Sequence, residues 1–245
     1  MKARRRSSHV QGGEDSYLAS VSDLMSGLTF LFIITLTILA VRVGQARKEL
    51  MSTKETRDSI LVVLQTELER RGVEVAIDTD AGVLRLPEKV VFPTGSATLE
   101  ARERENVLKL AGVMADVLPG YVGERRGGLP QVESVLIEGH TDSRSIHWPF
   151  KDNLELSTAR AREVFLTLTA SHALLDSLRN RDGIRVLGMS GYGDRRGIDS
   201  LQSESAWQKN RRIDLRFIMM PPQELPDSSR SSRAVVERVK AGMSR

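Results

Sequence analysis

Asp23 is an ionisable side chain at the edge of a long apolar run, and this position makes it the first candidate for chemistry. The stretch Leu24 to Val41 contains no charged residue. A carboxylate at the edge of such a run is costly in a membrane unless it is partnered or wetted, so a residue of this kind is functional by default. The plainer alternative is a flank in the lipid headgroup zone, because Glu14 and Asp15 lie just before it.

Other charged and small residues gather in five short strings from residue 91 onward. They read V-F-P-T-G-S-A-T-L at 91–99, I-E-G-H-T-D at 137–142, N-L-E-L-S-T-A-R-A at 153–161, G-Y-G-D at 191–194 and N-R-R-I-D-L-R-F at 210–217. None of them combines a nucleophile with a base and an orienting group, so we expect no enzyme activity.

Composition excludes several classes of site and partner. The chain has no cysteine, which rules out disulfides, zinc–thiolate sites and thiol nucleophiles. The net charge of +4 comes from basic residues that are scattered among 32 acidic ones, so we expect no nucleic-acid partner. We also expect no metal site and no cofactor.

The apolar run that follows Asp23 predicts a transmembrane helix. With Val21 and Ser22 it reaches the ~20 residues that cross a bilayer core of ~30 Å. The run is too long for a signal peptide, and no A-x-A cleavage motif follows it. Basic residues at positions 2 and 4–6 precede the run, which places the N-terminus in the cytoplasm and the rest of the chain in the periplasm of a bacterial inner membrane.

Helix formers continue from Arg42 to Arg71, with a break expected near Gly44 and an end at Gly72. Leucines and Ile60 form an intermittent apolar stripe in this stretch. We expect the stripe to pair two chains, for instance through Leu61 or Leu64, or to plug a pathway.

Beyond Gly72, single strands alternate with helices. Strands are expected at 73–77, 83–86, 132–138, 184–189 and 212–219, and helices at 97–118 and 154–179. A hairpin turn is expected at 79–82. This order predicts an α+β fold, in which helices cover one sheet as an α/β sandwich, preceded by a single transmembrane helix.

In order and spacing, the five strings resemble the OmpA-like peptidoglycan-binding domain over roughly residues 73–220. The resemblance implies binding to the peptide stem of peptidoglycan, in particular to diaminopimelate, whose free end carries an ammonium and a carboxylate. Asp142 matches the family carboxylate that takes the ammonium. Arg160 matches the arginine that takes the carboxylate through a bidentate pair. For an isolated Asp and Arg, a mutual ion pair would be the simpler interpretation.

The same resemblance adds Asn153, Leu154 and Arg211 to the binding residues. Asn153 stands at the start of the helix, where its side chain can also cap free N–H groups. Of Arg211 and Arg212, one can touch the ligand while the other braces the sheet, and we assign Arg211 to the site. The glycines at 139 and 191 are interpreted as residues that the backbone geometry requires, not as ligand contacts, and His140 is interpreted as a packing residue.

One loop departs from the family pattern. Residues 143–152 contain no glycine and carry His147, Trp148 and Pro149. The affinity or the glycan partner can therefore differ from those of the family.

The residues around Asp23 resemble the B subunit of ion-driven stators, the MotB kind, in the string Y-L-A-S-V-S-D-L-M-S-G-L at 17–28. In that family an aspartate at the cytoplasmic end of the helix binds the translocated proton or sodium ion. Ser22, Ser26 and Gly27 are expected on the side of Asp23, facing a partner. The resemblance implies a multispan A subunit of the MotA or ZorA type, five A chains to two B chains, and therefore a homodimer.

Two motors fit these features, and a passive membrane-to-peptidoglycan tether remains the alternative from another class. Flagellar MotB usually has Tyr-Ala-Asp and a substantial linker, whereas this chain has Val21-Ser22-Asp23 and a compact helical stretch. The sequence therefore favours ZorB of the Zorya anti-phage defence system. The expected segments are a cytoplasmic tail (1–15), a membrane helix (16–44), a helical linker or plug (45–72), the wall-binding domain (73–220) and a C-terminal tail (221–245).

Overall fold

The computed structural model describes residues 11–93, 95–123, 131–146 and 149–221. The basic cluster at positions 2–6, the residues His147 and Trp148, and nearly all of the expected C-terminal tail lie outside these ranges.

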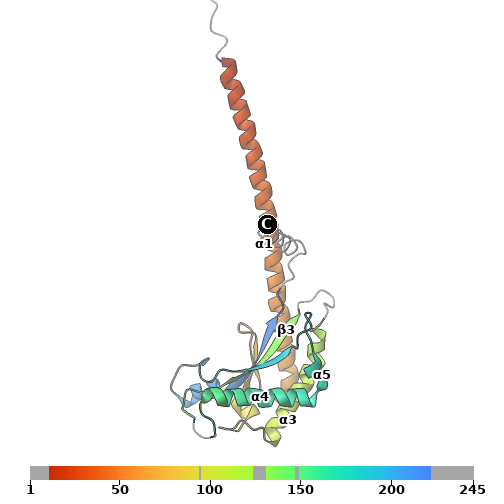
Figure 1. The fold of residues 1–245 in the computed structure, drawn as a ribbon, viewed down its shortest axis with the longest axis vertical. Helices are drawn as coiled ribbons and strands as arrows, with labels where there is room; N and C mark the ends of the chain where they lie inside the picture. The colour runs from red at the N-terminus through yellow and green to blue at the C-terminus, as the bar shows by residue number, and fades with distance from the viewer. Residues whose placement is uncertain (1–10, 94, 124–130, 147–148, 222–245) are drawn as a thin grey trace, which may run out of the picture. The chain divides into compact units, whose positions relative to one another are not determined.

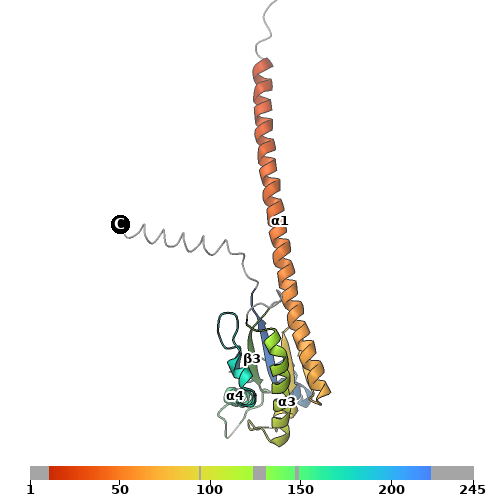
Figure 2. The ribbon, with the colours of Figure 1, turned by 90° about the vertical axis from the view of Figure 1, so that its right-hand side faces the viewer.

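A single helix, α1, runs from Gln11 to Arg70 (Figures 1 and 2). It passes through Gly44 without interruption, so the expected break there is wrong. One isolated glycine costs a helix only about 1 kcal/mol relative to alanine, and the strong helix formers on both sides outweigh that cost. Within the described residues, α1 is the one helix long and apolar enough to cross a membrane, by length and composition.

The predicted end of this helix is confirmed at Gly72, which has a φ of 75°. Its N–H donates to the carbonyl of Glu69 at 2.9 Å, and the N–H of Val73 donates to the carbonyl of Leu68 at 2.9 Å. This is the Schellman arrangement, in which a left-handed residue lets the last carbonyls of the helix find partners. Leu68 and Val73 are both buried, which adds the apolar contact typical of this motif.

The chain divides into two compact units, residues 1–49 and Leu50–Arg245. The boundary expected at residue 73 falls inside the second unit. The apolar stripe of α1 is the reason, because Ile60, Leu61, Leu64 and Leu68 are fully buried in the core of that unit. Leu61 and Leu64 therefore pack within their own chain, which corrects the expectation that these two residues pair two chains.

The second unit contains one five-stranded sheet. Its strands are β1 (Ala76–Asp78), β2 (Val83–Pro87), β3 (Val132–His140), β4 (Leu187–Gly191) and β5 (Arg212–Met219), in the spatial order β1-β2-β5-β3-β4. Strands β3 and β4 are parallel and the other pairs are antiparallel. The hairpin at 79–82 is confirmed. The fourth strand begins three residues later than predicted.

Helices α3 (Ala101–Val117) and α4 (Asn153–Ser171) pack against each other, and α4 lies on β3 and β4. Figure 1 shows α4 crossing the strands with α3 beside it, and Figure 2 shows α4 end-on. The helix predicted at 154–179 is two helices, because the chain leaves helical geometry at His172 before α5 (Ala173–Ser177). Three short elements were not predicted: α2 (Glu88–Val91), η1 (Leu118–Gly120) and α6 (Glu204–Asn210).

Alternation along the strands separates an apolar face from a charged face. Ile137 on β3 and Leu215 on β5 are cross-strand partners in the core, together with Leu84 on β2. The residues between them along the strands, such as Glu138 and Asp214, point to the other face. The expected α+β sandwich preceded by one long apolar helix is confirmed.

Candidate functional site

The candidate site lies at one end of the sheet, where three chain segments meet. β2 and β3 both run antiparallel to β5, so their carboxyl ends both lie beside the start of β5. The register places Pro87 and His140 opposite Arg212. Glu88 follows β2, Asp142 follows β3 and Arg211 precedes β5, so these three side chains share one edge of the sheet.

Helix α4 brings Arg160 to the same edge because it lies unusually close to the sheet. A Cβ on Gly139 would collide with the backbone of Ser157, and one on Gly191 would collide with Thr158. Both glycines are therefore required by the backbone geometry, as interpreted from the sequence, since only glycine allows the helix to come so close to the strands. The Ser157 hydroxyl also accepts a hydrogen bond from the Gly193 N–H at 2.8 Å, which ties the G-Y-G-D segment to the helix.

A continuous chain of ion pairs connects Arg160 to Asp142. Arg160 Nη2 donates to Glu88 Oε1, and Arg211 Nε donates to Glu88 Oε2, both at 2.5 Å. Arg211 Nη1 then donates to Asp142 Oδ2 at 2.7 Å. Arg160 is buried, with 2% of its side chain exposed, and its Nε donates to the carbonyl of Ser96. Asp142 and Arg160 thus take different partners, and the mutual ion pair of the simpler interpretation does not form.

Asp142 has a second arginine partner on its outer side. Arg144 donates to Asp142 Oδ2 from Nη2 at 2.6 Å and from Nε at 3.1 Å, and its backbone N–H donates to Asp142 Oδ1. Burial raises the pKa of the Asp142 carboxyl, but the hydrogen bonds from Arg144 and Arg211 outweigh burial and hold the pKa below its ordinary value. Asp142 is therefore an anion at neutral pH, as an ammonium-binding residue must be.

A pocket of ≈ 280 Å³ opens at this edge of the sheet. Its walls include Glu88, Thr141, Asp142, Asn153, Arg160 and Arg211. The Thr141 hydroxyl is buried and has no hydrogen-bond partner within the described part of the chain. A buried hydroxyl without a partner is costly, so a ligand group at this position would gain a hydrogen bond that the protein alone does not make.

The remaining predicted site residues, Asn153 and Leu154, lie at this pocket and at a second pocket beside it. Asn153 lines both pockets, and its amide donates to the carbonyls of Asp142 and Arg144 at 3.2 and 2.9 Å. It therefore braces the loop after β3, whereas the cap of α4 is Asp152, which accepts from the Glu155 N–H. Leu154 lines only the adjacent pocket of ≈ 320 Å³.

Arg211 and Arg212 take the two different roles that the sequence left open. Arg211 lines the pocket. Burial lowers the pKa of its guanidinium, but the hydrogen bonds that it donates to Asp142 and Glu204, together with the charge of Glu88, raise the pKa above the ordinary value. Arg212 points to the other face of the sheet, where it donates to Asp214 at 3.0 Å and to the carbonyl of Arg196.

Sequence reasoning missed Glu88, Arg144 and Glu204. Glu88 falls before the first of the five strings, and nothing in its local sequence marks it as a partner of residues 72 and 123 positions away. Arg144 falls in the loop that departs from the family pattern. Glu204 begins a short helix that was not predicted, and it reaches both Arg144 and Arg211.

On the charged face of the sheet, Glu138, His140 and Asp214 bring carboxylate and imidazole atoms within 4.8 Å of one another. Arginines already occupy both carboxylates: Arg216 donates twice to Glu138 at 2.8 Å, and Arg85 and Arg212 each donate to Asp214 at 3.0 Å. A cation would compete with these guanidinium groups, so the cluster is a structural charge network. Burial and the charge of Arg212 lower the pKa of His140 to about 3, which leaves its ring neutral.

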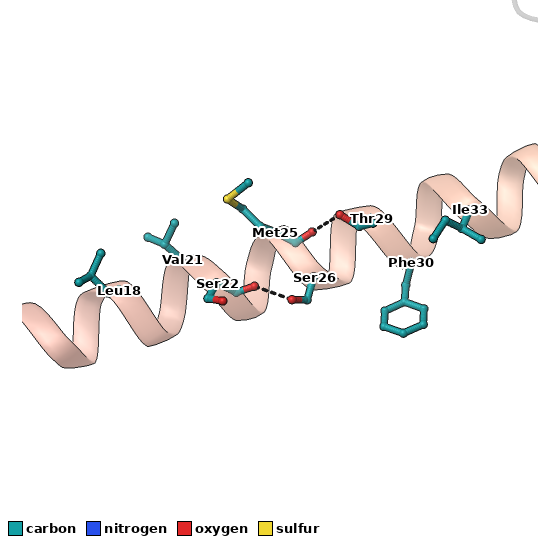
Figure 3. A pocket seen from close by; sticks show the side chains of 8 residues that line it. All are labelled: Leu18, Val21, Ser22, Met25, Ser26, Thr29, Phe30 and Ile33. Atoms are coloured by element: carbon teal, nitrogen blue, oxygen red, sulfur yellow. Dashed lines mark hydrogen bonds between the residues drawn. The ribbon is translucent and has the colours of Figure 1, made fainter.

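The apolar part of α1 carries the other predicted residue, Asp23, which makes no hydrogen bond or ion pair with any side chain that the structure describes. Figure 3 shows a shallow groove on this helix, lined by Leu18, Val21, Ser22, Met25, Ser26, Thr29, Phe30 and Ile33. Ser22 and Ser26 line this groove, and Asp23 and Gly27 are not among its lining residues.

Four hydroxyl groups of this stretch are satisfied within the helix. Ser26 donates to the carbonyl of Ser22 and Thr29 to that of Met25, both at 2.8 Å (Figure 3). Thr35 and Thr37 do the same further along the helix, with the carbonyls of Leu31 and Ile33. No hydroxyl proton of these four side chains would enter a hydrocarbon layer unpaired.

No protein-family model matches the sequence, and no curated protein matches it. Several solved structures resemble the fold. The cell wall anchor of the T6SS from Pseudomonas aeruginosa has a TM-score of 0.46 and 22% identity, over 67% of this chain and 97% of its own.

The MotB-like protein from Desulfovibrio vulgaris gives a TM-score of 0.48 with 18% identity, over 76% of this chain and 99% of its own. The periplasmic domain of Helicobacter pylori MotB, residues 90–256, gives 0.43 with 20% identity, over 64% and 82%. At these identities and TM-scores, the likenesses assign neither an activity nor a site residue to this chain.

Proposed function

We propose that this chain is the peptidoglycan-anchored B subunit of an ion-driven stator in a bacterial inner membrane. Its apolar helix spans the membrane once, with the N-terminus in the cytoplasm and the α/β domain in the periplasm. In this role the chain is not an enzyme: its domain binds the cell wall, and Asp23 carries the ion.

The observation that carries the anchoring role is the charge balance of the ion pairs at the pocket. Arg144, Arg160 and Arg211 line the pocket. They are paired with Glu88 and Asp142, which also line it, and with Glu204, which lies outside the lining. A ligand that brings only one charge would leave an unpaired opposite charge in a desolvated site, which is strongly unfavourable. A ligand end with one ammonium and one carboxylate can exchange partners while the balance is kept. The free end of diaminopimelate in the peptidoglycan stem has this chemistry.

The test is a pull-down of the detergent-solubilised full chain with purified diaminopimelate-type peptidoglycan. Removing one member of a buried charge pair costs about 2 to 5 kcal/mol, so Asp142→Ala and Arg160→Ala should each lose nearly all binding. Asp176→Ala is the matched control, because Asp176 also pairs with an arginine, Arg185, but lies on the surface outside the pocket. Circular dichroism must first show that the variants are folded. Wild-type binding by a folded Asp142→Ala would remove the pocket from the proposal.

The motor role rests on the position of Asp23. One helix cannot surround an ion in lipid, so a conducting pathway needs further helices with polar groups. A multispan A subunit of the MotA or ZorA type, in a ratio of five to two, and a homodimer of this chain complete the proposal. The translocated ion, a proton or sodium, is the cargo.

Among motors, we favour a Zorya-type defence complex over a flagellar stator. The feature that supports this choice is the lack of a long linker, because residues 50–70 already belong to the compact second unit. Neighbouring genes would decide it: helicase or nuclease genes beside an A-subunit gene support defence, and motility genes contradict it.

A further inference from the structure

Arg144 is the most exposed of the three arginines in the charge cluster. Its side chain is 45% exposed, compared with 8% for Asp142, 11% for Arg211 and 2% for Arg160. It nevertheless makes two side-chain hydrogen bonds to Asp142 Oδ2 and covers the outer side of that carboxylate. Of the cations bound to Asp142 in the described residues, Arg144 is the one that can leave without moving a buried side chain.

The Arg144 guanidinium has two further partners beside Asp142. Its Nη1 lies 3.4 Å from Glu204 Oε2, and its central carbon lies 4.5 Å from the centroid of the Trp207 ring. A guanidinium over an indole ring, beside a carboxylate, is held by cation–π attraction and by charge. The side chain can therefore release Asp142 and stay paired with Glu204 through a small rotation.

We infer that Arg144 is an internal competitor that occupies the ammonium position of the site. When a ligand binds Asp142, Arg144 releases that carboxylate and keeps its contacts with Glu204 and Trp207. This inference rests on the proposed function, because it takes the ligand to be the zwitterionic end of a diaminopimelate stem. The ligand ammonium replaces one guanidinium on Asp142 and the displaced guanidinium remains nearby. No charge is left unpaired by the exchange.

Competition of this kind sets the affinity of the site and selects its ligand. A simple amine brings no carboxylate for Arg160 and Arg211. Its ammonium group has to displace Arg144 from Asp142 without the help of a second contact. A ligand with both groups gains two sets of hydrogen bonds for one displaced ion pair. The geometry therefore favours zwitterions over simple amines.

Isothermal titration calorimetry with free meso-diaminopimelate and the detergent-solubilised full chain tests the inference. Arg144→Gln removes the competing charge, and we expect it to bind about five-fold tighter than the wild type, the factor that corresponds to one exposed ion pair. Arg144→Lys keeps a cation but loses the two-point contact with Asp142, so its affinity should fall between those of the wild type and Arg144→Gln. Arg185→Gln is the matched control, since Arg185 is an exposed arginine paired with an aspartate away from the pocket, and its affinity should not change.

The outcomes separate the inference from the proposed function. Weaker binding by Arg144→Gln would make Arg144 a direct ligand contact, and unchanged binding would mean that it does not compete; either result overturns the inference. Asp142→Ala should abolish binding in every case if the proposed function holds. If neither the wild type nor Arg144→Gln binds the probe, or if Asp142→Ala binds it normally, the proposed function fails and the inference fails with it.

Discussion

Two stretches of the single helix α1 use apolar residues in opposite ways. Between Leu24 and Val41 the side chains point out from all sides of the helix and are exposed. Between Ile60 and Leu68 the apolar residues form one stripe that is fully buried in the second unit. An apolar stripe can be covered by one neighbour, whereas a helix that is apolar all round has to be surrounded. The first stretch therefore needs lipid or other subunits, and the second finds its partners in its own chain.

The same contrast holds for charge. Asp23 lacks a partner among the side chains that the structure describes. In the second unit, Asp142, Glu138 and Asp214 are buried and each accepts hydrogen bonds from arginines. In the proposed motor, the partner of Asp23 lies in another subunit, whereas these carboxylates of the second unit find their partners within one chain.

The largest effect of a substitution is expected at Asp23. Asp23→Asn keeps the shape of the side chain but can neither carry the charge nor release a proton, so we expect complete loss of phage resistance, or of swimming. Co-purification with the A subunit and peptidoglycan pull-down should stay at wild-type levels. Asp58→Asn, the same change in the second unit of the same helix, is the control. Full activity of an assembled Asp23→Asn complex would leave only the passive tether.

The next largest effect is on stability, and it is tested by the same leucine-to-alanine substitution in each of the two stretches of α1. Leu64 is fully buried and Leu36 is 47% exposed. We expect Leu64→Ala to lower the free energy of unfolding of the domain by about 2 to 5 kcal/mol, because it leaves a cavity in the core. Leu36→Ala should change it by less than about 0.5 kcal/mol. Urea unfolding followed by circular dichroism measures both, and equal losses would contradict the division of α1 into two units.

A smaller effect comes from His140, a buried group without a hydrogen-bond partner in the described residues. Its folded pKa of about 3 lies below the ordinary value of 6.5, so the unfolded chain binds a proton that the folded chain does not. The resulting stability is present above pH 6.5 and is lost as the pH falls toward 3. We expect the free energy of unfolding to drop by about 2 kcal/mol between pH 7.5 and pH 5.

His140→Gln should remove most of that pH dependence, and His172→Gln, at the end of α4, should keep it. The ring of His140 should also show no titration by NMR between pH 7.5 and pH 5 in the folded wild type. A titration near pH 6.5 would mean that the cluster around Glu138 is open to water.

The smallest effect concerns one hydrogen bond at the start of α4. Asp152 accepts from the Glu155 N–H at 2.8 Å, so Asp152→Ala should cost about 1 kcal/mol of stability, the usual value of an N-cap. Asn153→Ala should leave the cap intact and instead weaken ligand binding, because it frees the loop after β3. Thermal unfolding and calorimetric titration of the two variants separate the roles, and a larger stability loss in Asn153→Ala would reverse them.

Much of the fold follows from local patterns. Alternation predicted strands at 83–86, 132–138 and 212–219 within one or two residues, and Gly72 predicted the end of α1. The errors fall where tertiary contacts compete with local preference. The stripe at Ile60–Leu68 was expected to pair two chains or to plug a pathway, because sequence periodicity shows that a face is apolar without showing what covers it.

By itself, the sequence determined which segments are apolar all round, which are apolar on one face, and which strings carry Asp142, Arg160 and Arg211. These features follow from composition and spacing, which do not depend on the conformation of the chain. Only the tertiary structure decided which charges meet. Glu88 reaches Arg160 and Arg211 because two antiparallel pairings bring the carboxyl ends of β2 and β3 to the start of β5. Contacts between residues so far apart in sequence depend on register and on the close approach of α4 to Gly139, and no local pattern encodes either.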